Sequence, residues 1–65
     1  MEDYQIRVIQ EQKELDEKIN KLEAFIRTDT YDKLDDDEKF RLIDQWEVMN
    51  DYSTILGKRI ECFDD

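Results

Sequence analysis

The amino-acid sequence predicts an all-α protein, an antiparallel hairpin of two long helices that associates into a helical bundle. Large apolar residues recur at steps of three and four in two stretches, proline is absent, and the 65 residues include a single glycine. A short acidic segment separates the two stretches. We therefore expect one domain over residues 1–65, with helices over about 3–27 and 36–62 and a corner over about 28–35.

The first predicted helix carries one apolar stripe. Its members are separated by three, four or seven residues, which places them on one side of an α-helix: Tyr4, Val8, Leu15, Ile19, Leu22 and Ile26. Glu11 and Gln12 interrupt the stripe one turn before Leu15. An exposed gap near a frayed helix end explains this interruption more simply than a functional carboxylate at Glu11.

The second predicted helix carries a heptad-like stripe and additional apolar residues beside it. The stripe is Leu42, Trp46, Met49, Leu56, Ile60 and Phe63, and Ser53 takes the turn between Met49 and Leu56. Phe40, Ile43, Tyr52 and Ile55 widen the apolar face. Gly57 lies inside this helix at a cost of about 1 kcal/mol relative to alanine. It either lets another backbone approach closely or marks fraying near the helix end.

The acidic segment TYDKLDDDEKF, residues 30–40, predicts the start of the second helix. Asp35 and Glu38 have the spacing of a capping box, and acids in a first turn are stabilised by the positive end of the helix dipole. A calcium loop needs alternating acids around a central glycine, and no glycine is near. The sequence thus predicts a helix cap here and no metal site.

Two helices alone make a thin core, and the second helix is apolar over more than a narrow seam. This surplus predicts a homo-oligomer, most simply a dimer of hairpins that forms a four-helix bundle. We expect the core and the oligomer contacts to be built from Leu15, Ile19, Leu22, Ile26, Leu42, Trp46, Met49, Leu56 and Ile60. Cys62 is the only cysteine, so no disulfide within the chain stabilises the fold, and a lone thiol fits a reducing compartment.

The composition argues against several classes of partner. Nineteen acids against ten bases give a net charge of −9, which repels nucleic acid and anionic membranes, so we expect neither direct DNA binding nor membrane binding. No apolar run approaches the ~20 residues that span a bilayer. The N-terminus lacks the layout of a signal peptide. These features predict a cytoplasmic protein.

The residue types also argue against catalysis. Histidine is absent and cysteine occurs once, so the usual general base, the usual zinc ligands and the Glu-x-x-His pairs of di-metal bundles are missing. The carboxylates lie on predicted exposed helix faces, and no glycine-rich loop can cradle a phosphate. We expect a protein that is not an enzyme and uses no metal or cofactor.

One set of polar residues is a candidate ligand site. An antiparallel hairpin brings both chain ends together, so Arg7 can join Lys58 and Arg59 in a basic pocket, with Tyr52 about two turns away and Gln45 beside the stripe. A phosphate or nucleotide is the ligand that such a pocket suits. Structural readings compete: Lys58 and Arg59 favour the negative pole of the helix, and Gln45 suits a solvated or inter-helix position.

Three segments, KELDEKINKLEAFI, YDKL and FRLIDQWEVMNDYSTILGKRI, resemble a family of small bacteriophage proteins related to a crAss-like phage protein. The chain departs from the family pattern at Tyr31, where phenylalanine is usual, and at Trp46, where an aliphatic residue is common. The shared positions are Arg7, Val8, Glu14, Leu15, Ile19, Lys21, Leu22, Phe25, Tyr31, Leu34, Leu42, Gln45, Met49, Tyr52, Ile55, Leu56, Arg59 and Ile60.

The resemblance implies a phage accessory protein that acts in the host cytoplasm by stoichiometric binding. It leaves three functions open. The protein blocks a host defence or regulatory protein, or it is a sponge that sequesters a cyclic nucleotide immune signal at Arg7, Tyr52, Lys58, Arg59 and Gln45, or it is a phage structural or assembly factor. The net charge favours the first function, and the polar residues within the pattern favour the second. On the sequence alone, protein binding ranks slightly ahead.

Overall fold

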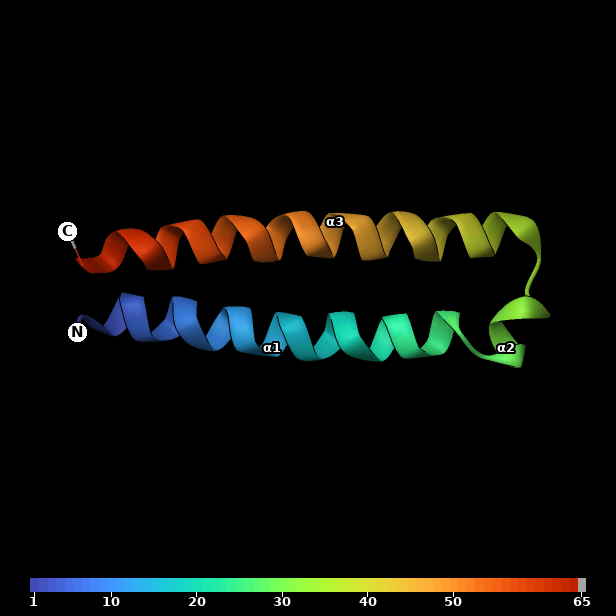
Figure 1. Ribbon diagram of the computed structural model, residues 1–65, viewed down its shortest axis with the longest axis horizontal. Helices are drawn as coiled ribbons and strands as arrows, with labels where there is room; N and C mark the ends of the chain where they lie inside the picture. The colour runs from blue at the N-terminus through green and yellow to red at the C-terminus, as the bar shows by residue number, and fades with distance from the viewer. Residues whose placement is uncertain (65) are drawn as a thin grey trace.

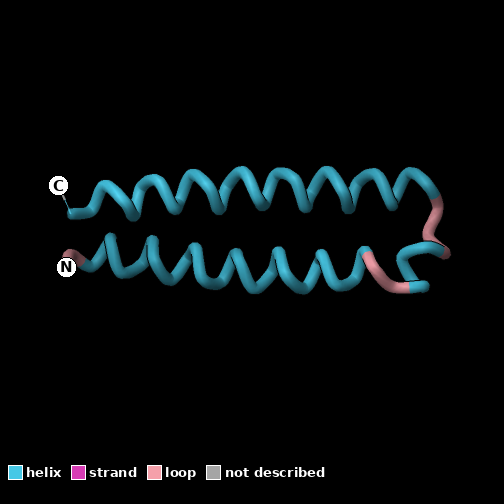
Figure 2. Tube along the Cα trace, viewed as in Figure 1, coloured by secondary structure: helices cyan, strands magenta, loops and turns pink. Residues whose placement is uncertain are grey.

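The computed structural model describes residues 1–64, which are helical with short connections and contain no strand. Helix α1 spans Asp3–Ile26, α2 spans Asp29–Asp32, and α3 spans Asp36–Glu61, followed by the 3-10 helix η1, Cys62–Asp64. The all-α prediction is confirmed. Helices α1 and α3 lie side by side and run in opposite directions, so both chain ends lie at one end of the molecule and α2 at the other (Figures 1 and 2).

The core is a narrow seam between α1 and α3. Its buried members are Val8, Leu15 and Ile19 of α1 and Leu56 of α3, of which Leu56 is fully buried. Val8 belongs to the predicted stripe but not to the predicted core set. The predicted core residues other than Leu15, Ile19 and Leu56 are only partly buried, because a single facing helix cannot cover a whole apolar face. These partly buried residues are Leu22, Ile26, Leu42, Trp46, Met49 and Ile60.

A polar contact crosses the seam at the point where the sequence interrupts the first apolar stripe. The Gln12 side-chain amide donates a hydrogen bond of 3.1 Å to the backbone carbonyl of Ser53, and the Ser53 hydroxyl donates one of 2.6 Å to Asp16. Glu11 is exposed, as expected, but Gln12 is partly buried and bridges the two helices. The expectation of an exposed gap is therefore wrong for Gln12.

Gly57 provides space for this bridge. A Cβ atom at Gly57 would lie 3.1 Å from the Gln12 side-chain nitrogen, which is tighter than most real Cβ contacts. Gly57 is inside α3, four residues before its end, and the nearby group is a side chain. Neither fraying nor the approach of another backbone, the two explanations that the sequence allowed, accounts for this glycine.

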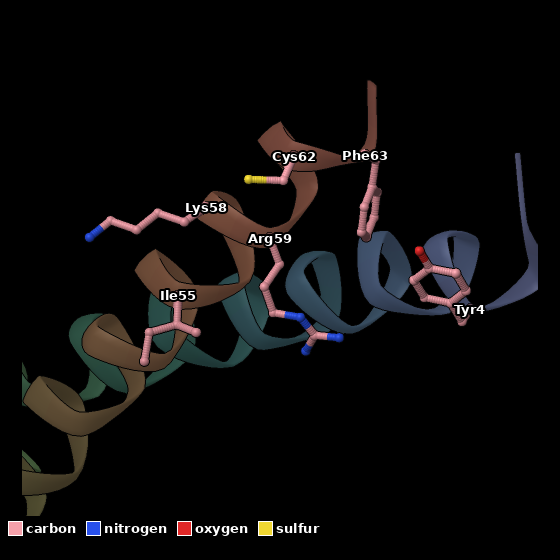
Figure 3. Close-up of a pocket in the computed structure, with 6 residues that line it drawn as sticks. All are labelled: Tyr4, Ile55, Lys58, Arg59, Cys62 and Phe63. Carbon is pink, nitrogen blue, oxygen red and sulfur yellow. The ribbon is translucent and has the colours of Figure 1, made fainter. Parts of the chain in front are cut away.

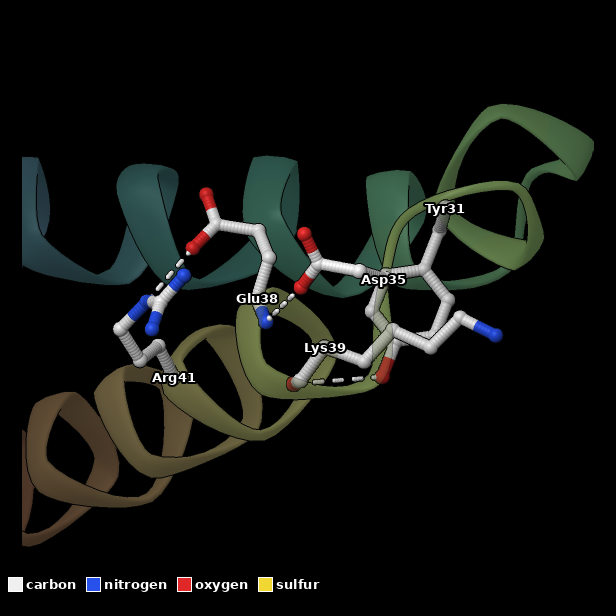
Figure 4. A network of polar contacts seen from close by, with 5 residues as sticks. All are labelled: Tyr31, Asp35, Glu38, Lys39 and Arg41. Atoms are coloured by element: carbon white, nitrogen blue, oxygen red, sulfur yellow. Dashed lines mark hydrogen bonds and ion pairs between the residues drawn. The ribbon is translucent and has the colours of Figure 1, made fainter.

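The corner is organised by two helix caps, of which Figure 4 shows the one that begins α3. Asp35 accepts a hydrogen bond of 2.8 Å from the Glu38 backbone N–H and begins α3, as the sequence predicts. The return bond of the predicted capping box is not formed, because the Glu38 carboxylate accepts instead from Arg41 at 2.9 Å. At α2, the Thr28 hydroxyl accepts from the backbone N–H of Tyr31 at 3.2 Å.

Tyr31 joins the corner to both long helices. Its ring meets Phe25 of α1 edge to face with centroids 6.4 Å apart, and its hydroxyl donates to the backbone carbonyl of Lys39 in α3 at 3.4 Å (Figure 4). Among the described side chains of residues 1–63, no three His, Cys, Asp or Glu residues are grouped so that they could hold a metal ion. The acidic corner thus has a structural role: its caps begin α2 and α3, and its aromatic contact joins the corner to α1.

Candidate functional site

A hollow of about 460 Å³ lies at the end of the molecule where the two termini meet (Figure 3). Its volume falls in the range of roughly 300–1,000 Å³ that is usual for small-ligand sites. Helix α3 and η1 provide most of the wall, and α1 adds one tyrosine because the antiparallel arrangement brings its first turn alongside. The lining residues are Tyr4, Ile55, Lys58, Arg59, Cys62 and Phe63.

Aromatic rings form one side of the hollow. Tyr4 and Phe63 meet edge to face, with ring centroids 5.8 Å apart and planes at 82°. Tyr4 keeps 54% of its surface exposed and Ile55 keeps 55%, so the apolar surface is open to a ligand. A flat ring can pack against such a surface, because aromatic side chains offer large apolar area and favour offset-stacked or edge-to-face contacts with another ring.

Two cations complete the hollow. Lys58 and Arg59 occupy the last turn of α3, and both are exposed. Neither takes part in the two ion pairs found among the described side chains of residues 1–63, which are Arg27–Glu23 and Arg41–Glu38. In Figure 3 the Arg59 guanidinium lies between Ile55 and Tyr4, whereas the Lys58 amine extends to the other side. A guanidinium in this position can bind a phosphate through two parallel hydrogen bonds.

The residues that the sequence nominates as ligand-binding do not all meet in one chain. Lys58 and Arg59 line the hollow, and Arg7 and Tyr52 do not. Gln45 lies fourteen residues before Arg59 on the same helix, which corresponds to about 21 Å. Its amide nitrogen contacts the Met49 sulfur at 3.8 Å.

Sequence reasoning missed Tyr4, Ile55, Cys62 and Phe63 as lining residues. These residues could have been identified from the sequence, because an antiparallel hairpin places residue 4 of the first helix beside residues near 60 of the second. Tyr4 and Phe63 each belong to an apolar stripe, so the sequence analysis gave neither of them a role in ligand binding. Stripe membership did not show that more than half of the Tyr4 surface stays exposed, whereas Phe63 is partly buried against the core.

A second hollow of about 200 Å³ lies toward the corner, lined by Glu23, Ile26, Arg27, Ile43 and Trp46. Its cation is already engaged, because Arg27 binds the Glu23 carboxylate at 3.0 Å. The buried indole nitrogen of Trp46 has no hydrogen-bond partner among the residues that the structure describes. The second hollow is smaller than the first, and its arginine is paired with a carboxylate. It is therefore a weaker candidate for an anionic ligand than the hollow around Arg59.

The comparisons with known proteins agree with a binding role for this chain. The Sequestin family matches residues 2–62, a range that includes every lining residue of the first hollow except Phe63. No curated protein and no solved structure matches the chain. None of the helices in residues 1–64 is long and apolar enough to span a membrane. Since the match covers nearly all of its length, the chain belongs to the Sequestin family.

Proposed function

We propose that the protein sequesters a small anionic ligand with an aromatic ring, in particular a cyclic nucleotide, by stoichiometric binding and without transforming it. The observation that carries this proposal is the hollow in which Arg59 lies beside Tyr4, with Phe63 adjoining. A nucleotide presents a phosphate and a flat base. The guanidinium suits the phosphate, and the rings suit the base.

The family name supports the proposal, because a sequestering protein needs affinity for its target and no reaction. On the sequence alone, the net charge favours binding of a host protein over binding of a cyclic nucleotide. The gathering of two cations and two rings at one end of the molecule reverses that order. The net charge of −9 is an average over the chain, whereas the potential at a binding site depends mainly on nearby charges.

The proposal also takes up what the resemblance to small phage proteins implies. We place the protein in the cytoplasm of an infected bacterium, where a cyclic nucleotide serves as an immune signal. We expect a homo-oligomer, because eight large apolar side chains remain substantially exposed in one chain: Met1, Tyr4, Ile6, Ile9, Phe40, Val48, Tyr52 and Ile55. By removing the free signal, the protein would blunt the response that the signal triggers.

A host protein is the second candidate target, and a specific observation favours it. Phe40 is 68% exposed and stands at the acidic start of α3, after Asp36, Asp37 and Glu38. An exposed aromatic residue beside negative charge suits a partner whose own surface is basic. This site lies at the corner, far from the hollow at the chain termini, so the two candidates can be tested separately.

Thermal-shift measurements against cyclic di- and trinucleotides test the proposal. We expect one nucleotide to raise the melting temperature by several degrees and Arg59→Ala to abolish the rise. Arg41→Ala is the matched control, because it removes the same charge at the corner and should keep the rise. If no nucleotide shifts the melting temperature and Phe40→Ala releases a host protein captured by a tagged bait, the second candidate replaces the first.

A further inference from the structure

The hollow around Arg59 is built from the two ends of the chain, and α1 contributes a single side chain to it. Tyr4 lies in the first turn of α1, whereas the other lining residues belong to α3 and η1. The Tyr4 ring lies beside Phe63 in an edge-to-face contact with 5.8 Å between the centroids (Figure 3). The wall that these two rings form therefore depends on the first turn of α1 staying helical.

A first helical turn is the part of a helix that opens most easily. Its first four N–H groups have no partner within the helix, and residues at a chain end open locally at a low cost in free energy. Glu2 occupies the N-cap of α1, and glutamate is not among the residues preferred there, which are Ser, Thr, Asp and Asn. The turn that carries Tyr4 thus needs support from another group.

Gln5 gives that support. Its side-chain carbonyl oxygen accepts a hydrogen bond of 2.8 Å from the Glu2 backbone N–H, which is the bond that the third helical residue makes in a capping box. The Glu2 backbone carbonyl accepts from the backbone N–H groups of Gln5 at 3.0 Å and Ile6 at 3.2 Å. These bonds close the turn on both sides of Tyr4. Gln5 itself does not line the hollow.

We infer that Gln5 is a positioning residue for the ligand site, which acts through Tyr4 and not by contact with the ligand. This inference rests on the proposed function. When only part of the population is competent to bind, the apparent affinity falls by that fraction. Without the Gln5 bond the first turn opens more often, and Tyr4 then leaves its place beside Phe63. Because the ligand binds the ordered turn better, it should in return order this end of the chain.

Gln5→Ala tests the role of this bond. It should weaken binding of the nucleotide that stabilises the wild type by roughly twofold to tenfold. The melting temperature of the free protein should hardly change, because the lost bond is exposed and lies at the chain end. Gln10→Ala is the matched control, since the Gln10 amide donates to Glu14 at 3.1 Å within the same helix and caps nothing. Isothermal titration calorimetry compares the affinities, and equal values for Gln5→Ala and the wild type would overturn the inference.

A rescue at the N-cap separates the order of the turn from other effects of the Gln5 substitution. In the Gln5→Ala background, Glu2→Ser introduces a preferred capping side chain and should restore the affinity. Glu2→Gln removes the same negative charge without introducing a preferred cap, and the affinity should stay low. No recovery with serine, or equal recovery with glutamine, would mean that the order of the turn does not control binding.

Amide hydrogen exchange reports on the turn directly. The Gln5 and Ile6 amides, which donate to the Glu2 carbonyl, should exchange faster in a Gln5→Ala variant at Ile6, and saturating nucleotide should slow both in the wild type. Unchanged exchange on binding overturns the inference and leaves the proposed function standing. A wild type that binds no nucleotide overturns the proposed function, and the role of Gln5 in binding with it.

Discussion

The side-chain amide of Gln12 in α1 donates a hydrogen bond to the backbone carbonyl of Ser53 in α3 at 3.1 Å. A backbone carbonyl inside a helix already accepts from the helix, so it can receive this second donor only where the facing helix comes close. Gly57, one turn further along α3, leaves the necessary space. The bond is one of the few polar contacts across the seam and helps to fix the register of the two helices.

Gly57→Ala should change stability by different amounts in two backgrounds. In the wild type, the gain in helix propensity of about 1 kcal/mol is largely cancelled, because the new methyl group displaces the Gln12 side chain. In a Gln12→Ala background the methyl group meets no obstacle, and the same substitution should stabilise by about 1 kcal/mol. Urea unfolding of the four variants measures both values. Equal effects in the two backgrounds would show that Gln12 and Gly57 are not coupled.

Asp35→Ala should destabilise the protein by about 0.5–2 kcal/mol, because the Glu38 backbone N–H loses its cap. Asp36→Ala is the matched control, since it removes the same charge from the first turn but no capping bond. Its effect should be smaller, and thermal unfolding compares the two. Stabilisation of the wild type by millimolar calcium would contradict this account of the acidic corner.

Trp46→Phe should destabilise much less than Trp46→Ala. Within the described part of the chain the indole nitrogen is buried without a hydrogen-bond partner, so phenylalanine removes an unsatisfied donor and keeps most of the apolar contact. Alanine removes that contact, and truncation of a well-packed tryptophan costs about 3–5 kcal/mol, an upper bound here because Trp46 is only partly buried. Chemical unfolding followed by circular dichroism measures both. Equal losses would mean that the indole N–H does have a partner.

Tyr4→Leu should weaken ligand binding with little loss of stability. More than half of the Tyr4 surface is exposed, so the ring contributes little to the core and is free to pack on a ligand. Phe40→Leu removes an exposed ring at the opposite end and is the control for a general loss of aromatic surface. Isothermal titration with the stabilising nucleotide should show weaker binding for Tyr4→Leu alone.

Most of the fold could be predicted from the helical spacing of the apolar residues and from the residue types at the helix cap. The spacing of Leu15, Ile19 and Leu56 identified the residues that the structure buries, and Asp35 with Glu38 located the start of α3. These features were predictable because they depend on residues close together in the chain. The fourth buried residue, Val8, also belongs to the predicted stripe.

The missing details depend on contacts between residues far apart in the chain. Nothing in the sequence near Gln12 indicates that its side chain will meet the carbonyl of Ser53, forty-one residues later. The sequence nominated Lys58 and Arg59 for the binding site but gave Tyr4 and Phe63 only as stripe residues, because periodicity does not show which stripe residues stay open to solvent. The Glu38 carboxylate accepts a hydrogen bond from Arg41 and not from the Asp35 backbone N–H. Both donors are close to Glu38 in the sequence, so the spacing alone does not decide between them.

Isothermal titration calorimetry with cyclic di- and trinucleotides, followed by recovery of the nucleotide from heat-denatured protein, tests the central claim most directly. The proposed sequestration predicts saturable binding by one nucleotide class and release of that nucleotide chemically intact. Absence of binding across the panel, or recovery of a cleaved or modified nucleotide, would contradict it.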